Sequence, residues 1–192
     1  MTEPVRQGAV PSDGGPLVFV ADLVAPVLDE ADHHHLARVR RLRDGDPLVI
    51  ADGQGWWRRA VFAGLEPEVV GAPVAEPPPV LEIAVGFALV KGTKPELAVQ
   101  KLTEIGVDRI APFTAGRSVV QWDGARSAAA QVRLEKVARE ASMQSRRARL
   151  PVVDPVASFA ALAAEPGSCR ADRGGDPPTL DQPFILTGPE GG

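Results

Sequence analysis

The final stretch of the chain, from Pro183 to Gly192, constrains the fold more than any other segment. Phe184 to Leu186 is a short apolar run of the kind found in buried strands, and it leads directly into Gly-Pro-Glu-Gly-Gly. Glycines in such a loop leave no Cβ between the backbone and a ligand. In open α/β sheets, ligands bind at the carboxyl ends of the strands. The stretch therefore predicts either a ligand-binding loop or an ordinary turn between a strand and a helix.

Length and charge narrow the classes of protein that fit. The 192 residues suffice for one large domain or two small ones. The formal net charge is −4, so any contact with nucleic acid must come from local basic patches. The single cysteine, Cys169, excludes an internal disulfide framework and a cysteine-cluster metal site, and it is typical of a reducing cytoplasm. We expect no membrane segment, because no apolar run is long enough to cross a bilayer.

Residues 1–75 are predicted to form a small β-barrel-like domain. Leu17–Val20, Leu48–Ile50 and Trp56–Phe62 have the composition of strands, and Asp52–Gly55 is typical of a hairpin turn. A short helix is expected from Asp32 to Leu42, with Asp32 as its N-cap. Its predicted apolar face consists of Leu36, Val39 and Leu42.

The same domain is rich in arginine beside two tryptophans. Basic side chains next to aromatic ones are suited to phosphate contact and base stacking. The alternative is a solvated helix face next to two core tryptophans. The run His33–His35 does not predict a metal site, because neighbours on a helix point in different directions and no cysteine completes the ligand set. The residues concerned in the basic and aromatic group are Arg38, Arg40, Arg41, Arg43, Trp56, Trp57, Arg58 and Arg59.

The proline-rich segment Pro73–Pro79 is predicted to be a stiff linker outside any sheet, and a second domain is expected over residues 80–192. Leu81–Val90 is apolar enough for a central strand covered on both faces. A helix should follow, beginning with the capping box of Thr93 and Glu96 and ending at Gly106. With the return strand Val107–Phe113, this is a βαβ unit, so the sheet should be parallel. The expected apolar face of the helix is Leu97, Leu102 and Ile105.

The remaining part of the second domain is predicted to be less regular. A long helix is expected from Asp123 to about Ser145, followed by a basic run over 146–149 that either binds phosphate or caps the helix C-terminus. Ser158–Ala164 should be a short helix, and Glu165–Gln182 should be a loop in which Ser168–Asp172 makes a poor strand. The residues of the long helix that are available for packing are Val132, Leu134, Val137 and Ala141.

Four segments resemble one known family. They are His-His-Leu-x-Arg-Val-x-Arg-Leu over 34–42, Leu-Val-Lys-Gly-x-Lys-x-Glu over 89–96, Gln100–Val107, and the glycine loop after Phe184–Leu186. The chain resembles the RsmE-type 16S rRNA (uracil-N3) methyltransferases of the SPOUT superfamily. It departs from their pattern at Met143, where the family has an acid, and at Arg146, where glycine is usual.

The resemblance implies an α/β protein with a PUA-like RNA-binding β-barrel over 1–75 and a SPOUT trefoil-knot methyltransferase domain over 80–192. It implies S-adenosyl-L-methionine as cofactor, 16S rRNA of the small ribosomal subunit as substrate, a cytoplasmic location, a homodimer at full length, and no metal. No residue stands out as the general base. The implied cofactor-binding residues are Leu186, Thr187, Gly188, Pro189, Glu190, Gly191 and Gly192, and the implied RNA-binding residues are Arg38, Arg41, Lys91, Lys94, Gln144 and Arg147.

The family pattern continues past the position of Gly192, where further residues complete the knot and the cofactor pocket. From the resemblance we therefore expect the chain to be inactive as it stands, with the knot incomplete. Two other functions remain open. One is a non-catalytic RNA-binding protein that uses the N-terminal module, and the other is a sibling SPOUT enzyme acting on transfer RNA.

Overall fold

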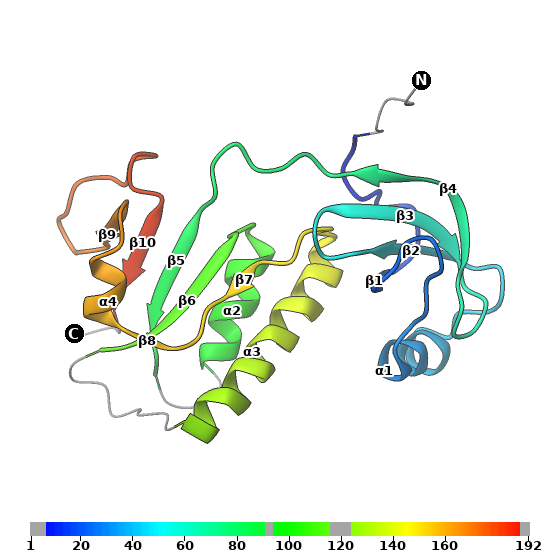
Figure 1. The fold of residues 1–192 in the computed structure, drawn as a ribbon, viewed down its shortest axis with the longest axis horizontal. Helices are drawn as coiled ribbons and strands as arrows, with labels where there is room; N and C mark the ends of the chain where they lie inside the picture. The colour runs from blue at the N-terminus through cyan, green and yellow to red at the C-terminus, as the bar shows by residue number, and fades with distance from the viewer. Residues whose placement is uncertain (1–6, 91–93, 116–123, 189–192) are drawn as a thin grey trace. The chain divides into compact units, whose positions relative to one another are not determined.

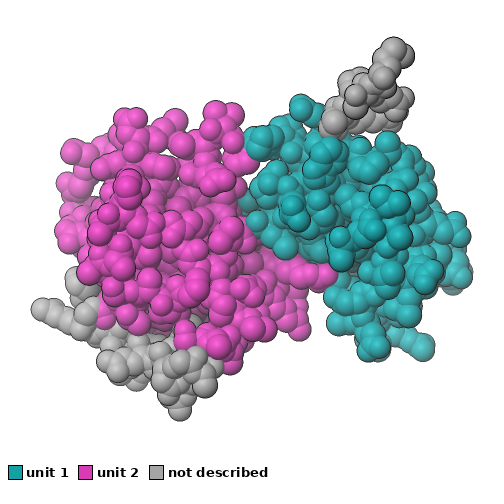
Figure 2. Space-filling model, in the orientation of Figure 1, with its two compact units in different colours: residues 1–78, 142–150 teal, residues 79–141, 151–192 magenta. Residues whose placement is uncertain are grey.

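The computed structural model describes residues 7–90, 94–115 and 124–188, with only the backbone described for 124–126. The chain divides into two compact units, shown in different colours in Figure 2. The first unit contains Met1–Pro78 together with Ser142–Leu150, and the second contains Pro79–Ala141 and Pro151–Gly192.

The first unit is built on a four-stranded sheet that confirms the predicted N-terminal β module (Figure 1). Its strand order is β1-β2-β3-β4, with β1 parallel to β2 and the other pairs antiparallel. The β2–β3 turn lies where the sequence predicts it, and Asp52 Oδ1 accepts hydrogen bonds from the backbone N–H of Gln54 and Trp56. The strands are β1 (Leu17–Phe19), β2 (Pro47–Ala51), β3 (Trp56–Val61) and β4 (Glu68–Ala75).

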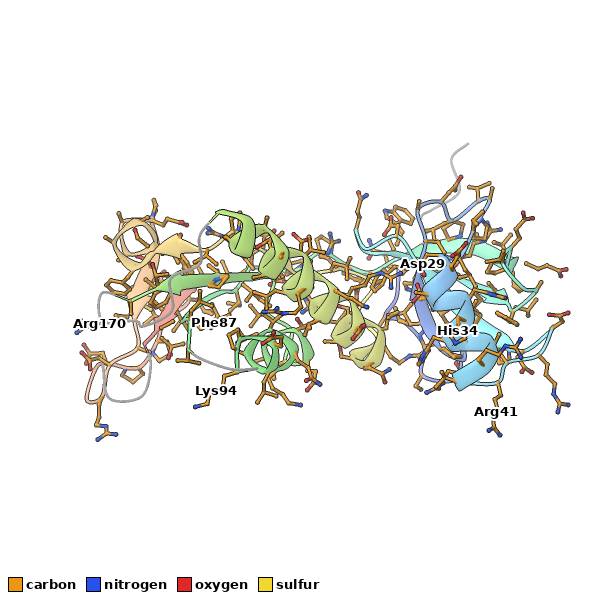
Figure 3. The ribbon with its side chains drawn as sticks, turned by 90° about the horizontal axis from the view of Figure 1, so that it is seen from below. Asp29, His34, Arg41, Phe87, Lys94 and Arg170 are labelled. Carbon is orange, nitrogen blue, oxygen red and sulfur yellow. The ribbon has the colours of Figure 1, made fainter. Side chains whose placement is uncertain are left out.

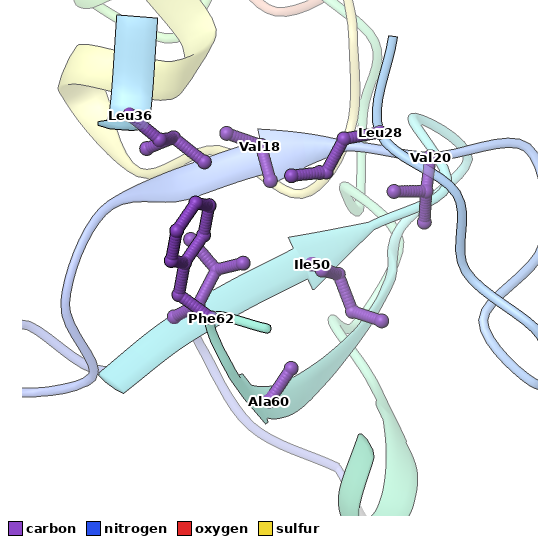
Figure 4. Packing of buried hydrophobic residues seen from close by; sticks show 8 residues of the cluster. Val18, Val20, Leu28, Leu36, Ile50, Ala60 and Phe62 are labelled. Atoms are coloured by element: carbon purple, nitrogen blue, oxygen red, sulfur yellow. The ribbon is translucent and has the colours of Figure 1, made fainter. Parts of the chain in front are cut away.

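The helical segment of the first unit differs from the prediction at both ends. α1 (Glu30–His34) begins earlier, because Asp29 rather than Asp32 is the N-cap and its carboxylate accepts from Asp32 N at 2.6 Å. The chain then widens into a π-helical turn, η1 (His35–Val39). The extra residue in this turn changes the direction of the side chains, so Leu36 is buried and Val39 is exposed. Figure 4 shows Leu36 with Val18, Phe62 and the other labelled side chains of the buried cluster.

The predicted linker begins later than expected, because β4 runs through Pro73 to Ala75. Two features allow a proline there. β4 lies at the edge of the sheet, and its register against β3 shifts between Trp57 and Arg59. Gly71, with φ +71°, lies in this irregular part of the strand. A proline at a bulge on an edge strand does not break a required ladder hydrogen bond.

The second unit contains a parallel sheet, as the βαβ pattern predicts. β5 and β6 are joined by α2 (Lys94–Glu104), and every strand pair described in this sheet is parallel. The strand order is β7-β6-β5-β10-β9, with β8 also pairing with β6. The strands are β5 (Ala84–Ala88), β6 (Arg109–Thr114), β7 (Val152–Val153), β8 (Ala157–Ser158), β9 (Ser168–Arg170) and β10 (Phe184–Thr187).

Buried clusters cover both faces of this sheet. On one face, Phe87 and Ile110 pack with residues of α2 and of α3 (Gly124–Ser145). On the other face, Phe113 and Leu186 pack with Leu162 of α4 (Phe159–Ala163). Successive side chains of a strand point to opposite faces of the sheet, so each strand contributes alternate residues to the two clusters.

The buried face of α2 agrees with the prediction only in part, because Leu102 packs against the buried cluster as expected but two other predicted residues do not. Val99 and Thr103 are fully buried, whereas Leu97 and Ile105 are exposed. Thr103 tolerates burial because its hydroxyl donates to Val99 O at 2.8 Å. The helix ends as predicted at Gly106, whose φ is +96°.

The helix α3 contributes to both units along the chain. Leu134 and Ala141 are buried as predicted, whereas Val132 is exposed. The residues from Ser142 to Leu150 belong to the first unit, where Leu150 N donates to Gly53 O at 2.9 Å.

The prediction that Ser168–Asp172 makes a poor strand is wrong. β9 pairs in parallel with β10, with Ser168 opposite Phe184 and Arg170 opposite Leu186. In the described sheet, β9 is the last strand of the order, so only one side of it needs a partner. Pairing depends on backbone groups, and an edge strand therefore tolerates polar side chains.

Candidate functional site

The carboxyl ends of three adjacent strands meet at one edge of the parallel sheet. Figure 1 shows β5 and β10 pointing the same way, and the register places Thr187 opposite Phe87 and Ala88 opposite Phe113. β5, β10 and β6 therefore end at nearly the same level. This edge is the position at which open parallel sheets bind ligands.

The strand β10 presents the predicted cofactor residues at this edge. The side chain of Leu186 is buried in the core, and its carbonyl accepts from Ala171 N at 2.8 Å. Thr187 is half-buried, and Gly188 is exposed with no atom within 4 Å of where a Cβ would lie. Leu186 thus anchors the strand, while Thr187 and Gly188 open toward solvent. The predicted residues Pro189–Gly192 lie outside the described part of the chain.

Gly86 of β5 leaves room for the side chain of Leu186, which lies opposite it in the neighbouring strand β10. A Cβ at this position would lie 2.5 Å from Leu186 Cδ2 and 3.2 Å from Ala111 O. Any larger residue would displace the buried side chain that anchors β10. No local sequence pattern indicates this packing, because the contacting atoms belong to strands that are distant in sequence.

The predicted RNA-binding residues fall into both units. Lys94 is the first residue of α2 in the second unit and is exposed, and Figure 3 shows its side chain extending away from the ribbon. Lys91 lies outside the described residues. Gln144 is exposed and Arg147 is half-buried, and both belong to the first unit. Arg147 N donates to Ser142 O and so closes the C-terminus of α3.

The arginines around η1 are exposed to solvent. Arg38 lies within η1, and Arg41 follows it in a left-handed conformation with φ +58°. Figure 3 shows the Arg41 side chain pointing away from the unit. Arg40 and Arg43 are exposed as well. These four guanidinium groups form a basic surface on the first unit.

Three of the remaining four members of the basic and aromatic group have partners within the first unit. Arg58 donates to Gly71 O at 2.7 Å and to Leu23 O at 3.0 Å, and Arg59 pairs with an aspartate. Trp57 is buried, and its Nε1 donates to Gly8 O at 2.8 Å. Of the two tryptophans, only Trp56 is exposed. The interpretation of Trp57 as a core residue is therefore the correct one.

An ion-pair cluster at the amino ends of the strands was not predicted. Arg109 Nε donates to Asp154 at 2.7 Å, Arg109 Nη1 donates to Glu165 at 2.6 Å, and the guanidinium lies 5.0 Å from the ring centre of Phe184. The hydrogen bond from Arg109 lowers the pKa of the Glu165 carboxyl, and burial opposes this effect. The cluster joins β6, β10 and the segments after β7 and α4. Its partners are separated by 45 and 56 residues, so no local pattern indicates it.

The described residues contain neither a cluster of metal ligands nor a membrane-spanning helix. Among them, no group of three or more His, Cys, Asp or Glu side chains is arranged to hold a metal ion. None of their helices combines the length and the hydrophobicity needed to cross a membrane.

Two family models match the chain. One, described as an RNA methyltransferase domain, matches residues 76–192, and the other, described as an RNA methyltransferase PUA domain, matches residues 28–68.

Curated relatives carry the name ribosomal RNA small subunit methyltransferase E. The relative from Mycobacterium bovis is 40% identical over 140 residues, covering 69% of this chain and 52% of the relative. The relative from Bacillus subtilis is 31% identical over 137 residues, covering 67% of this chain and 52% of the relative. The chain thus spans about half the length of these curated relatives.

Solved structures share the fold. The ribosomal RNA small subunit methyltransferase E of Neisseria gonorrhoeae, bound to S-adenosyl methionine, matches with a TM-score of 0.72 at 24% identity, covering 92% of this chain and 81% of that one. A probable rRNA-methyltransferase from Porphyromonas gingivalis matches with a TM-score of 0.69 at 27% identity, covering 92% and 80%. The α/β architecture with an N-terminal PUA-like module is therefore the one found in these proteins.

Proposed function

The chain belongs to the RNA methyltransferase family, and from that premise we propose that it acts in the S-adenosylmethionine-dependent methylation of N3 of a uridine in 16S rRNA. The observation that carries the proposal is the shared carboxyl edge of β5, β6 and β10, with β10 leading into Gly188. The 40% identity to the Mycobacterium bovis enzyme supports the choice of ribosomal RNA.

The open end of β10 fits a cofactor held mainly by backbone groups. Gly188 has free space where a side chain would lie, and Leu186 is fixed in the core beneath it. We assign cofactor contact to Thr187, Gly188 and residues Pro189–Gly192. When bound, S-adenosylmethionine supplies an activated methyl group. The protein residues then position the reacting groups, which is the main requirement of such a transfer.

The basic surface of the first unit suits the RNA strand. N3 of uridine lies on the Watson–Crick edge, so the target base must be unpaired or flipped before it can react. Exposed arginines that contact phosphates would hold the flanking strand in that state. We therefore propose residues 1–75 as the RNA-binding domain and 80–192 as the methyltransferase domain. Arg38, Arg41, Lys91, Lys94, Gln144 and Arg147 are the proposed RNA contacts. A SPOUT-type knot, a homodimer and a cytoplasmic location are proposed on the same family membership.

Deleting the gene for this chain in its source organism is the direct test. We expect N3-methyluridine to disappear from nuclease digests of 16S rRNA, as measured by mass spectrometry, and to return when the gene is restored. Digests of transfer RNA and of 23S rRNA from the same cells are the controls. Loss of the modified nucleoside from transfer RNA would identify a sibling enzyme, and unchanged digests would favour a non-catalytic RNA-binding protein.

Replacing Arg38 and Arg41 together by glutamine should weaken binding to single-stranded RNA. Each phosphate contact that is lost lowers the slope of log affinity against log salt by about 0.7. We expect roughly a tenfold loss of affinity at moderate salt and a slope lower by about 1 to 1.5, measured by fluorescence anisotropy. Arg170, an exposed arginine of the second unit that pairs with Asp172, provides the matched control when replaced by glutamine. An equal loss in both proteins would contradict the assignment.

A further inference from the structure

Arg146 adopts a backbone conformation that usually belongs to glycine. It follows the last residue of α3 with φ +58°, and Arg147 N donates to Ser142 O across it. Gly106 occupies the corresponding position after α2, with φ +96°. A residue with a Cβ is strained in this conformation. The side chain of Arg146 is therefore present at a position where the backbone alone would favour glycine.

The guanidinium of Arg146 is incompletely paired. Nη1 donates to Gly15 O at 2.9 Å, whereas Nε and Nη2 are shielded from solvent and have no hydrogen-bond partner among the described residues. Burial lowers the pKa of the Arg146 guanidinium, with the charge of Asp13 opposing the effect and that of Arg59 adding to it. Buried donors without acceptors are rare and costly, and they mark places where a water molecule or an ion binds.

A second guanidinium and one carboxylate lie in the same part of the first unit. Arg59 Nη2 pairs with Asp13 Oδ1 at 3.1 Å, and these two side chains are 46% and 79% exposed. Gly14 and Gly15 follow Asp13 in the chain. Gly15 O accepts the hydrogen bond from Arg146, and a Cβ on Gly14 would lie 3.6 Å from Arg59 Nη1. Two positive charges thus act against one negative charge. The outer side of the group, formed by Asp13 and Arg59, is accessible to solvent.

We propose that Arg146 and Arg59 form a binding site for a phosphate-type oxyanion, bordered by the Gly14–Gly15 turn. Guanidinium groups bind tetrahedral oxyanions through paired N–H donors, and Nε with Nη2 is such a pair. Without the anion, the exposed carboxylate of Asp13 pairs with Arg59, and the bound anion would displace this carboxylate. The oxyanion is either a phosphate of an RNA backbone or free phosphate. This site is independent of methyl transfer and would exist whether or not that proposal holds.

Thermal unfolding with inorganic phosphate tests the site. At about 20 mM phosphate, against chloride of equal ionic strength, we expect the Tm of the wild-type protein to rise by about 3 °C. Asp13→Asn removes the competing carboxylate and should enlarge this rise. Arg146→Gly should abolish the phosphate-dependent rise. In chloride alone, Arg146→Gly should also raise the Tm by about 2–4 °C, because it relieves both the strained φ and the unpaired donors.

Arg146→Ala is the matched control for the backbone effect. Alanine keeps a Cβ at φ +58° but has no guanidinium, so this variant should abolish the phosphate-dependent rise and gain less Tm in chloride than Arg146→Gly. The proposal is overturned if phosphate shifts wild type and Arg146→Gly equally. It is also overturned if neither wild type nor Asp13→Asn responds to phosphate.

A second measurement identifies the source of the anion. Binding of a uridine oligonucleotide to wild type and to Arg146→Gly is compared over a range of salt. An affinity loss of about tenfold with a lower salt slope assigns the site to an RNA phosphate. Equal RNA affinity, together with the phosphate response in unfolding, assigns it to free phosphate.

Discussion

Replacing Gly15 with alanine is expected to destabilise the first unit by about 3 kcal/mol, the largest effect of any single methyl group added to this unit. Gly15 has φ +77°, and a Cβ built there would overlap the carbonyl oxygen of Pro47. Because the obstacle is backbone, no change of side-chain rotamer relieves it. The chain must shift on one side of the contact or the other.

The shift would change the position of β1 in the sheet, because the turn at Gly15 leads directly into this strand. Val49 N donates to Pro16 O at 2.9 Å, and Leu17 pairs with Val49 in the adjacent strand. Moving Gly15 away from Pro47 therefore disturbs the parallel pairing of β1 with β2. The same movement displaces Gly15 O, which accepts the hydrogen bond from Arg146.

Gly45→Ala is the matched control for the Gly15 substitution. Gly45 has φ +90°, and no atom lies within 4 Å of the added Cβ, so it reports the conformational strain alone at about 1 kcal/mol. Urea unfolding followed by tryptophan fluorescence measures both, because Trp57 lies in the core of this unit. Equal losses in the two variants would show that the clash with Pro47 is relieved at no cost.

The sequence was most informative where local chemistry and hydrophobic pattern agree. The alternation of a buried strand, a helix ending at Gly106 and a second strand was sufficient to predict the parallel βαβ unit of β5, α2 and β6. The hairpin turn over Asp52–Gly55 was also predicted from its residue types. The structure shows why glycine is needed there, because Gly53 and Gly55 both have positive φ values. In each case the signal lies within a few residues of the element that it specifies.

Predictions failed where a residue's environment depends on distant parts of the chain. Leu97 and Ile105 are as apolar as the buried residues of α2, so hydrophobicity alone did not identify the face that contacts the sheet. β9 has the composition of a loop and is a strand because β10 offers it a free edge. The candidate site shows the same division. The strand leading to Gly188 was predicted, whereas the close packing of Gly86 against Leu186 depends on the sheet as a whole.

Replacing Arg109 with methionine should destabilise the second unit by about 2 kcal/mol. Removing one partner from a buried ion pair costs about 3–5 kcal/mol, because the other charge is left without compensation. Solvent reduces this cost here, since the Arg109 side chain is 35% exposed. The change leaves Asp154 and Glu165 without their shared donor and removes the cation from the ring of Phe184. Because Phe184 is the first residue of β10, the loss also loosens the strand that leads to Gly188.

The pH dependence separates this ion-pair effect from a simple loss of packing. The hydrogen bond from Arg109 lowers the pKa of Glu165 in the folded protein, so the pair stabilises the fold above the unfolded pKa of about 4.3 and loses its effect as pH falls through the folded value. The difference in unfolding free energy between wild type and Arg109→Met should therefore be constant from about pH 6 to 8 and shrink below about pH 4. Urea unfolding across this range measures this difference in unfolding free energy.

The control is Arg170→Met, which removes an exposed pair with Asp172 and should cost less than about 0.5 kcal/mol throughout. A difference for Arg109→Met that stays the same down to pH 3 would mean that the arginine stabilises β10 through its contact with Phe184 alone.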